Sequence, residues 1–162
     1  MIELYQDYIE KKLKEAGIKT KVCKSMKELK GFSGTHVGAA IVDKETFERE
    51  KKNKVYQSND NTVKRIMKLR RITIVNVIIG EFETSKCDEI FATFLSVMDK
   101  GIHDTEGNYI AIEIGEADWV DREDSILQSK IAVQLPITFY GGIYQDVTYR
   151  PFIPDVSINE EA

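Results

Sequence analysis

Six carboxylates gather within a short stretch in the last third of the sequence. They are Glu113, Glu116, Asp118, Asp121, Glu123 and Asp124. Oxygen ligands of this kind hold divalent cations, so a small metal-dependent enzyme is one hypothesis for this stretch. A nuclease of the common mixed-sheet type also needs a lysine at a fixed short spacing on an adjacent strand, and no such lysine is present here. We therefore favour a charged, solvated loop and keep the enzyme as an alternative.

The other residue types that carry catalysis are sparse. His36 and His103 are the only histidines, lie far apart in the sequence and match no catalytic or metal-binding spacing; His103 is expected in a loop. Cys23 and Cys87 form no CxxC pair and are expected to be reduced thiols. No phosphate-binding glycine loop and no Gly-x-Ser-x-Gly motif occurs. The sequence thus predicts a non-enzymatic protein with no catalytic residue, metal or cofactor.

The strongest local charge feature is a basic run between positions 64 and 71. Its members are Lys64, Arg65, Lys68, Arg70 and Arg71, interleaved with Ile66, Met67 and Leu69. One hypothesis is a surface that contacts acid-rich neighbours or passing DNA. The other is a solvated strand face whose positive charge discourages pairing with a foreign strand. The sequence leaves both open.

Aromatic side chains with polar tips and one proline are the remaining candidates for protein contacts. They are Trp119, Tyr140, Tyr144, Tyr149 and Pro136. Such aromatics are enriched at binding surfaces, although they can equally cap the local core. Pro136 cannot donate a backbone hydrogen bond, so its strand is expected to lie at a sheet edge, at least locally, or to carry a bulge. An open edge would be available to a partner.

Length and composition describe an ordinary folded domain. The chain has 162 residues, of which 42% are apolar and 31% charged, and we expect one domain over residues 1–150. The net charge of −4 argues against a dedicated nucleic-acid binder. No apolar stretch is long enough to span a membrane, and the sequence begins with an amphipathic pattern rather than a signal peptide. These features favour a cytosolic protein.

The first third predicts two helices and a strand. Apolar residues at helical spacing indicate a helix over residues 2–16, which ends before Gly17. A short strand is expected over residues 19–23, and a helical turn over residues 25–30 that Gly31 ends. Residues 37–43 predict a strand followed by a charged excursion over residues 44–54. The turn-rich segment SNDN, residues 58–61, predicts a hairpin with an exposed tip.

The middle of the chain predicts a buried strand and a second helix. The segment ITIVNVIIG, residues 72–80, is apolar on both faces and indicates a central strand buried on both sides for most of its length. Thr84 and Ser85 are N-cap candidates for the helix that follows, with Asp88 and Glu89 in its first turn. Its apolar stripe is expected to pack across the sheet.

The last third predicts strands. Residues 109–114 form one, after a turn at Gly107 and Asn108, and residues 131–139 alternate without a break. Gly141 and Gly142 are expected to turn the chain into a C-terminal hairpin with residues 143–149. Residues 151–162 have little to bury and predict an arm or tail. The result is an α+β fold, a mainly antiparallel sheet with an N-terminal helix and a second helix packed on it.

Taken in order, these segments resemble the phage tail-terminator family. The resemblance lies in the arrangement of a helix, strands, ITIVNVIIG, the helix DEIFATFLSVMDKGIHD, the segment GNYIAIEIGEADWVDRED and the ending IAVQLPITFYGGIYQDV, over residues 1–150. It implies a homo-hexameric ring that stacks on the last ring of the tail tube, stops tube growth and offers a surface to the head or collar. The implied partners are copies of the chain, the tube protein, a connector or collar protein, and DNA in the lumen. The implied location is the virion tail or neck, after assembly in the host cytoplasm.

Two further alternatives stay open beside the metal-dependent enzyme. One is another phage neck, tail-completion or connector protein of similar size. The other is a small cellular adaptor that uses the same sheet edges as a monomer or dimer. The candidate contact residues under the resemblance are Lys64, Arg65, Lys68, Arg70, Trp119, Pro136, Tyr140 and Tyr144.

Overall fold

The computed structural model describes residues 1–51, 55–59, 63–121, 123–125, 127 and 130–148, and of residues 55–59 only the backbone. The described chain divides into two compact units. The large unit comprises residues 1–47 and 71–141, and the small unit comprises residues 48–70 and 142–148. The tail predicted for residues 151–162 lies outside the described residues.

The two N-terminal helices form as the sequence predicts. Helix α1 spans Ile2–Glu15, and its apolar stripe of Tyr5, Ile9 and Leu13 is fully buried. Gly17 follows with a φ of +110°, a left-handed conformation in which glycine carries no steric penalty. Helix α2 spans Met26–Lys30. Its cap is reciprocal, because the Ser25 hydroxyl accepts a hydrogen bond from the Glu28 amide and the Glu28 carboxylate accepts one from the Lys24 amide.

The strand predicted for residues 19–23 is wrong, and the next strand is longer than expected. Cys23 makes a single parallel bridge with Ala39, at the start of β1. Strand β1 spans Val37–Arg49, so the charged segment after position 43 continues the strand instead of leaving it. Its charge is compensated within the sheet, since Glu45 accepts hydrogen bonds from Arg71 and Thr73 of β3.

The predicted hairpin and central strand are both present. Strand β2 spans Val55–Asn59 and pairs antiparallel with β3, which spans Val63–Glu81; residues 60–62 between them lie outside the described residues. Burial on both faces of β3 is limited to its last five residues, from Val77 to Glu81. The expectation of two-sided burial over most of the apolar segment is therefore wrong, because Ile72 and Ile74 stay partly exposed.

Helix α3 spans Thr84–Val97. Its N-cap residue lies one position before the predicted candidates Thr84 and Ser85. Glu83 is the N-cap, its carbonyl accepts from the Cys87 amide, and no side chain caps the helix. Thr84 and Ser85 are thus inside the helix, and the predicted acidic first turn is wrong because Asp88 and Glu89 follow it. The stripe packs as expected, and Cys87 and Phe94 are fully buried.

The last third contains β4 (Gly101–His103), β5 (Tyr109–Ile114), β6 (Asp118–Val120) and β7 (Ile131–Thr148). His103 pairs with Tyr109 in β4 and β5, so its predicted place in a loop is wrong. The predicted turn at Gly141 and Gly142 is also wrong, because β7 runs through both. Neither glycine has the positive φ that a tight hairpin turn requires.

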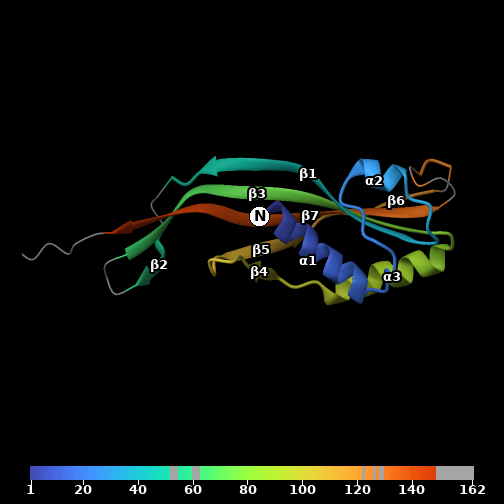
Figure 1. Ribbon diagram of the computed structural model, residues 1–162, viewed down its shortest axis with the longest axis horizontal. Helices are drawn as coiled ribbons and strands as arrows, with labels where there is room; N and C mark the ends of the chain where they lie inside the picture. The colour runs from blue at the N-terminus through green and yellow to red at the C-terminus, as the bar shows by residue number, and fades with distance from the viewer. Residues whose placement is uncertain (52–54, 60–62, 122, 126, 128–129, 149–162) are drawn as a thin grey trace, which may run out of the picture. The chain divides into compact units, whose positions relative to one another are not determined.

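Hydrogen bonding places the strands in the order β1-β3-β7-β5-β4, with β2 paired to β3 and β6 paired to β7. The pairings of β4, β5 and β6 are antiparallel. In the large unit, α1 and α3 lie side by side over one sheet face, and their core includes Val77, Leu135 and Phe139 (Figure 1). Leu29 of α2 and Leu127 pack on the opposite face with Ile78. The α+β prediction is confirmed.

In the described part of the chain, no helix combines the length and apolarity needed to cross a membrane.

Candidate assembly surfaces

Each arginine of the basic run lies near a carboxylate on, or just past the end of, a neighbouring strand. Arg65 donates two hydrogen bonds to Asp146, at 2.8 and 2.9 Å, and these bonds hold the pKa of that carboxyl below its ordinary value. Arg70 lies 3.8 Å from Glu50. Arg71 lies 2.7 Å from the Glu45 carboxylate. Much of the positive charge of this run is therefore balanced inside the chain.

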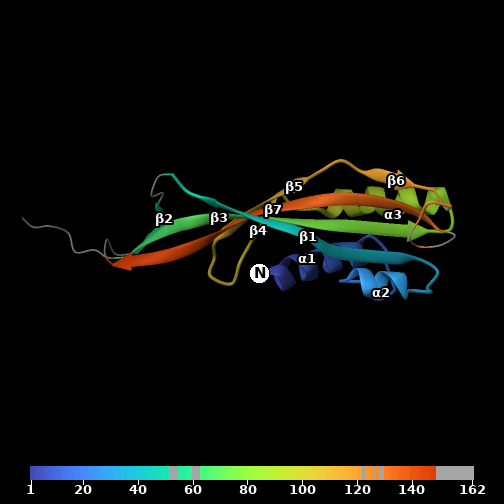
Figure 2. The same ribbon diagram turned by 90° about the horizontal axis from the view of Figure 1, so that it is seen from above.

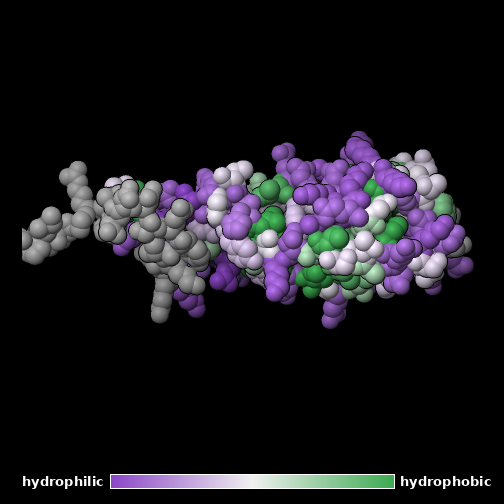
Figure 3. Space-filling view, turned by 90° about the horizontal axis from the view of Figure 1, so that it is seen from below, coloured by the Kyte–Doolittle hydropathy of each residue, from purple (hydrophilic) through white to green (hydrophobic). Residues whose placement is uncertain are grey.

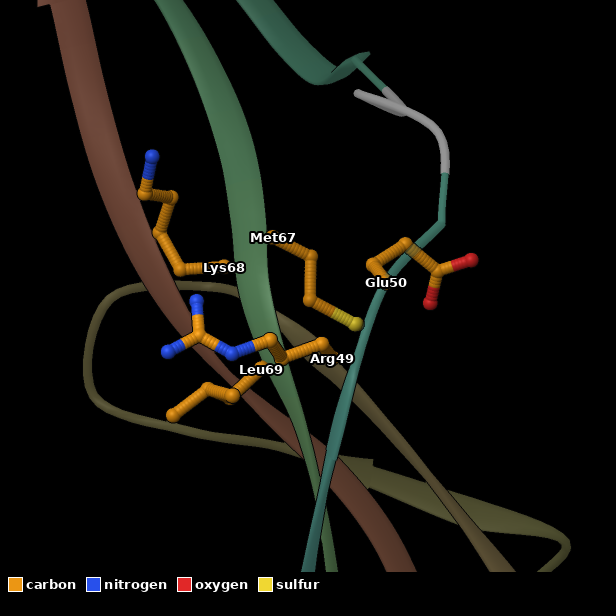
Figure 4. Close-up of a pocket in the computed structure, with 5 residues that line it drawn as sticks. All are labelled: Arg49, Glu50, Met67, Lys68 and Leu69. Carbon is orange, nitrogen blue, oxygen red and sulfur yellow. The ribbon is translucent and has the colours of Figure 1, made fainter.

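The exposed member of the run that lacks a carboxylate partner among the described residues is Lys68. It lines a hollow of about 320 Å³ in the small unit together with Arg49, Glu50, Met67 and Leu69 (Figure 4). Of the described residues that line this hollow, Glu50 is the only carboxylate, and it also lies near Arg70. The positive charges of Arg49 and Lys68 therefore exceed the negative charge at the hollow. The hollow can attract an anion, but it has no buried polar group that would select one. The structure thus leaves both interpretations of the basic run open, and it places Arg49 of β1 beside Lys68 at the same hollow.

Trp119 lies at the border of the large unit's sheet, beside α3. Its ring meets that of Phe91 edge to face, with centroids 5.8 Å apart, and it stands opposite the buried Val133 in the ladder. Ile114 stands opposite the buried Ile137 on the same, core-bearing face. Yet Ile114 and Trp119 are 43% and 44% exposed. The apolar face of the sheet therefore continues past the cover of the helices and reaches solvent. Apolar patches in a mostly hydrophilic surface are visible from below in Figure 3.

Pro136 lies in the gap between two partner strands. Strand β7 pairs with β5 up to Ile114 and with β6 from Asp118, so it is an inner strand with a local break. The Pro136 carbonyl accepts from the Gly115 amide at 2.9 Å, and its ring nitrogen faces the same side. β7 as a whole is therefore an inner strand. The local edge that Pro136 predicts is confirmed, because the ladder is interrupted at this residue.

The candidate tyrosines lie partly against their own units. The Tyr140 hydroxyl donates to the Glu113 carboxylate at 2.8 Å, and the Tyr140 side chain is half-buried. Tyr144 is half-buried beside Gly142, whose lack of a side chain leaves room for the Tyr144 ring and for Met67. Tyr149 lies outside the described residues. Tyr140 and Tyr144 therefore present less free surface than Trp119.

The acidic stretch opens onto solvent and does not converge on one point. A hollow of about 380 Å³ is lined by Asp121, Glu123, Asp124 and Ile131. Within the described residues, no group of three or more His, Cys, Asp or Glu side chains is arranged to hold a metal ion. The carboxylates contribute a negative surface next to Trp119.

The histidines and cysteines have structural surroundings. His36 accepts a hydrogen bond from the Lys19 amide through Nε2, and its Nδ1 lies 3.6 Å from Glu81. Cys23 and Cys87 are buried, and burial raises the pKa of both thiols, that of Cys87 to about 11. Neither thiol is activated for nucleophilic chemistry.

The large unit has two charged surfaces at opposite borders of its sheet. The acidic edge consists of Ile114, Glu116, Asp118, Trp119 and Asp121, all exposed on or after β5 and β6. The lysine edge consists of the exposed residues Lys14, Lys19, Lys21, Met26, Lys27 and Lys30. The acids and Trp119 could be identified from the sequence, whereas the lysine edge was not predicted. Its signal is the excess of eight lysines over two glutamates between positions 11 and 30.

Comparison with known proteins does not assign the chain to a family. No protein-family model matches the sequence, and the search of curated proteins finds no match.

Proposed function

We propose that the chain is a tail-terminator subunit, which forms a ring that caps the tail tube of a phage or phage-derived particle. The observation that carries the proposal is the apolar sheet face at Ile114 and Trp119, which stays exposed at a border beside the core. Large side chains left exposed next to a packed core are typical of surfaces that another protein covers. The order of helices and strands that carried the resemblance is compatible with this role.

Capping would follow from geometry alone. One face of the ring matches the growing tube, and the other lacks the surface that accepts a further tube subunit. That second face would then be available to a connector or collar protein. The ring would assemble in the host cytoplasm and be retained in the tail or neck of the particle. Lys68 and Arg49 are the residues to examine for contact with passing DNA, since their charge exceeds that of the adjacent carboxylate.

The first prediction concerns the mass of the assembled protein. Light scattering over a range of concentrations, followed by negative-stain imaging, should show rings of about six subunits. A monomer that forms rings only after tail tubes are added would agree equally well. A monomer or dimer at every concentration that ignores tubes would contradict the proposal and favour a cellular adaptor. Stoichiometric binding of Mg²⁺ or Mn²⁺ in calorimetry would favour the metal-dependent enzyme.

The neighbour that the ring binds separates a terminator from another neck or connector protein. Purified subunits should bind the ends of tail tubes and stop further addition of tube protein. Binding to portal or connector rings without an effect on tube length would assign the chain to the alternative group of neck proteins.

A further inference from the structure

We propose that the lysine edge of one subunit docks on the acidic edge of the next, in a head-to-tail contact between two copies of this chain. The inference rests on the proposed ring function and names the two surfaces that would close the ring. Strand order, charge and exposed apolar side chains within the large unit support it.

Strand order places the two surfaces at opposite borders of one sheet. Cys23 bridges to β1, the outermost strand on one side, and α2 follows three residues later. On the other side, β6 pairs with β7 and, among the described strands, with no other. Figure 2 shows α1 and α2 on one side of β1 and β3, and β5 and β6 on the other. Two such borders can meet only between different copies.

The charges of the two borders are complementary. Residues 11–30 contain eight lysines and two glutamates, whereas residues 113–124 contain six carboxylates and one arginine. Lys19, Lys27 and Lys30 have no carboxylate partner among the described residues, and Glu116 and Asp118 have no cationic one there. Charges left unpaired within a subunit are available to the neighbour, and they steer encounter and fix orientation more than they add affinity.

Both borders also carry exposed apolar side chains that can anchor the contact. Ile114 and Trp119 are exposed on the acidic edge, and Met26 is 39% exposed on α2 within the lysine edge. A thioether packs well against an aromatic ring, and lysine stems cover apolar surface while their ammonium groups reach carboxylates at the rim. An apolar centre inside a charged rim is the usual composition of a specific interface.

The two surfaces differ in charge, so neither matches a second copy of itself. A two-fold dimer through either border alone would place like charges together, which is unfavourable. A contact between unlike borders instead repeats with a constant rotation and closes into a ring when that rotation fits.

The test uses charge reversal at each border in the full chain. The acidic-edge variant carries Glu116→Lys and Asp118→Lys, and the lysine-edge variant carries Lys27→Glu and Lys30→Glu. All four positions are exposed, so circular dichroism and thermal unfolding should match the wild type. Each variant alone should raise the concentration for half assembly at least ~10-fold, because like charges then face each other.

The decisive result is whether assembly is restored when the charges of both borders are reversed together. A chain with all four substitutions has exchanged the signs of its two borders and keeps the wild-type net charge of −4. It should assemble like the wild type, as should an equimolar mixture of the two single-border variants. The matched control carries Glu48→Lys and Lys51→Glu, exposed residues outside both borders, and should not change assembly. Failure of both restorations, or normal assembly of both single-border variants, would overturn the inference.

Tryptophan fluorescence gives a second, independent readout. Trp119 is the only tryptophan in the chain, so the emission reports on the acidic edge alone. Assembly should shift the emission to shorter wavelength and protect it from acrylamide; identical spectra in ring and monomer would contradict the docking geometry. Wild-type rings that charge reversal leaves intact would reject this contact and keep the proposed function. A wild-type chain that never forms rings, even with tubes, would reject both.

Discussion

Three side chains link α1 to Asp99, two residues past the end of α3. Lys12 Nζ lies 3.0 Å from the Asp99 carboxylate, the Tyr8 hydroxyl donates to the same carboxylate at 3.1 Å, and the Asp99 amide donates to the Tyr8 oxygen at 2.9 Å. The hydrogen bond from Lys12 is the main reason that the pKa of Asp99 lies below its ordinary value. Burial alone would lower the pKa of Lys12, yet the hydrogen bond and charge of Asp99 raise it.

Removal of the Asp99 charge should destabilise the protein in a pH-dependent way. A carboxyl with a lowered folded pKa contributes stability above its ordinary value of 3.8, and the contribution is lost as pH falls through the folded pKa. Asp99→Asn should cost about 0.5–1 kcal/mol at pH 7, since the half-exposed carboxylate is screened by solvent. Urea unfolding should show the difference from wild type shrinking below about pH 4. Glu89→Gln on α3 is the exposed control, and a difference that persists to pH 2 would refute the explanation.

At the scale of elements, the break between β5 and β6 depends on the pairing of Gly115 with Pro136. A Cβ at position 115 would lie 2.7 Å from the proline Cγ and 2.9 Å from its carbonyl oxygen. Neither atom belongs to a flexible side-chain end. The missing side chain therefore allows the chain to leave β5 and re-enter the sheet as β6, which carries Trp119.

Gly115→Ala should consequently lower the free energy of unfolding by about 1–3 kcal/mol, because overpacking forces the backbone to move. The matched control is Gly31→Ala, where the nearest atom to an added Cβ is 3.6 Å away and φ is −86°. The control should change stability by less than about 0.5 kcal/mol. Equal stability of the two variants in urea unfolding would show that the loop relaxes around the new methyl group.

Elements set by neighbouring residues were predictable from the sequence. The helical spacing of α1, the helical turn of α2 that ends at Gly31 and the hairpin of β2 and β3 all depend on residues close in the chain. The predictions were wrong where contacts with strands distant in the sequence determine the local conformation. The charged end of β1 stays extended because Arg71 and Thr73 bind Glu45. In β7, Gly141 stays extended beside Tyr5 and Ile110, and Gly142 stays extended beside Met67. These contacting residues lie far away in the sequence, so a local sequence pattern does not reveal them.

At the scale of the whole molecule, the surfaces were harder to predict than the fold. Trp119 could be selected by residue type, and the acidic stretch by composition. The lysine edge could not be placed opposite them, because that relation depends on β1 and β6 lying at different borders of the sheet. The basic run was conspicuous in the sequence, yet each of its three arginines lies near a carboxylate, Asp146, Glu50 or Glu45.

Assembly of the full chain should weaken with salt. At ~0.5 M NaCl the Debye length falls well below its value of ~10 Å at 0.1 M, so attraction between exposed borders is screened. The concentration for half assembly, measured by light scattering, should rise between ~0.05 and 0.5 M NaCl and then level off, since the apolar anchors remain. Rings that become more stable with salt would indicate a contact made by the apolar residues alone.

The two buried native thiols should have low reactivity toward thiol reagents. With a pKa of about 11, Cys87 is ionised in about one molecule per thousand at pH 8, and Cys23 is likewise enclosed. Reagents for thiols will therefore react slowly with the folded native chain. A cysteine introduced on the surface, at position 27 or 116 for instance, can then be labelled or cross-linked selectively without first replacing the native ones. Because both native cysteines are buried, a single introduced surface cysteine can be modified selectively in the otherwise natural sequence.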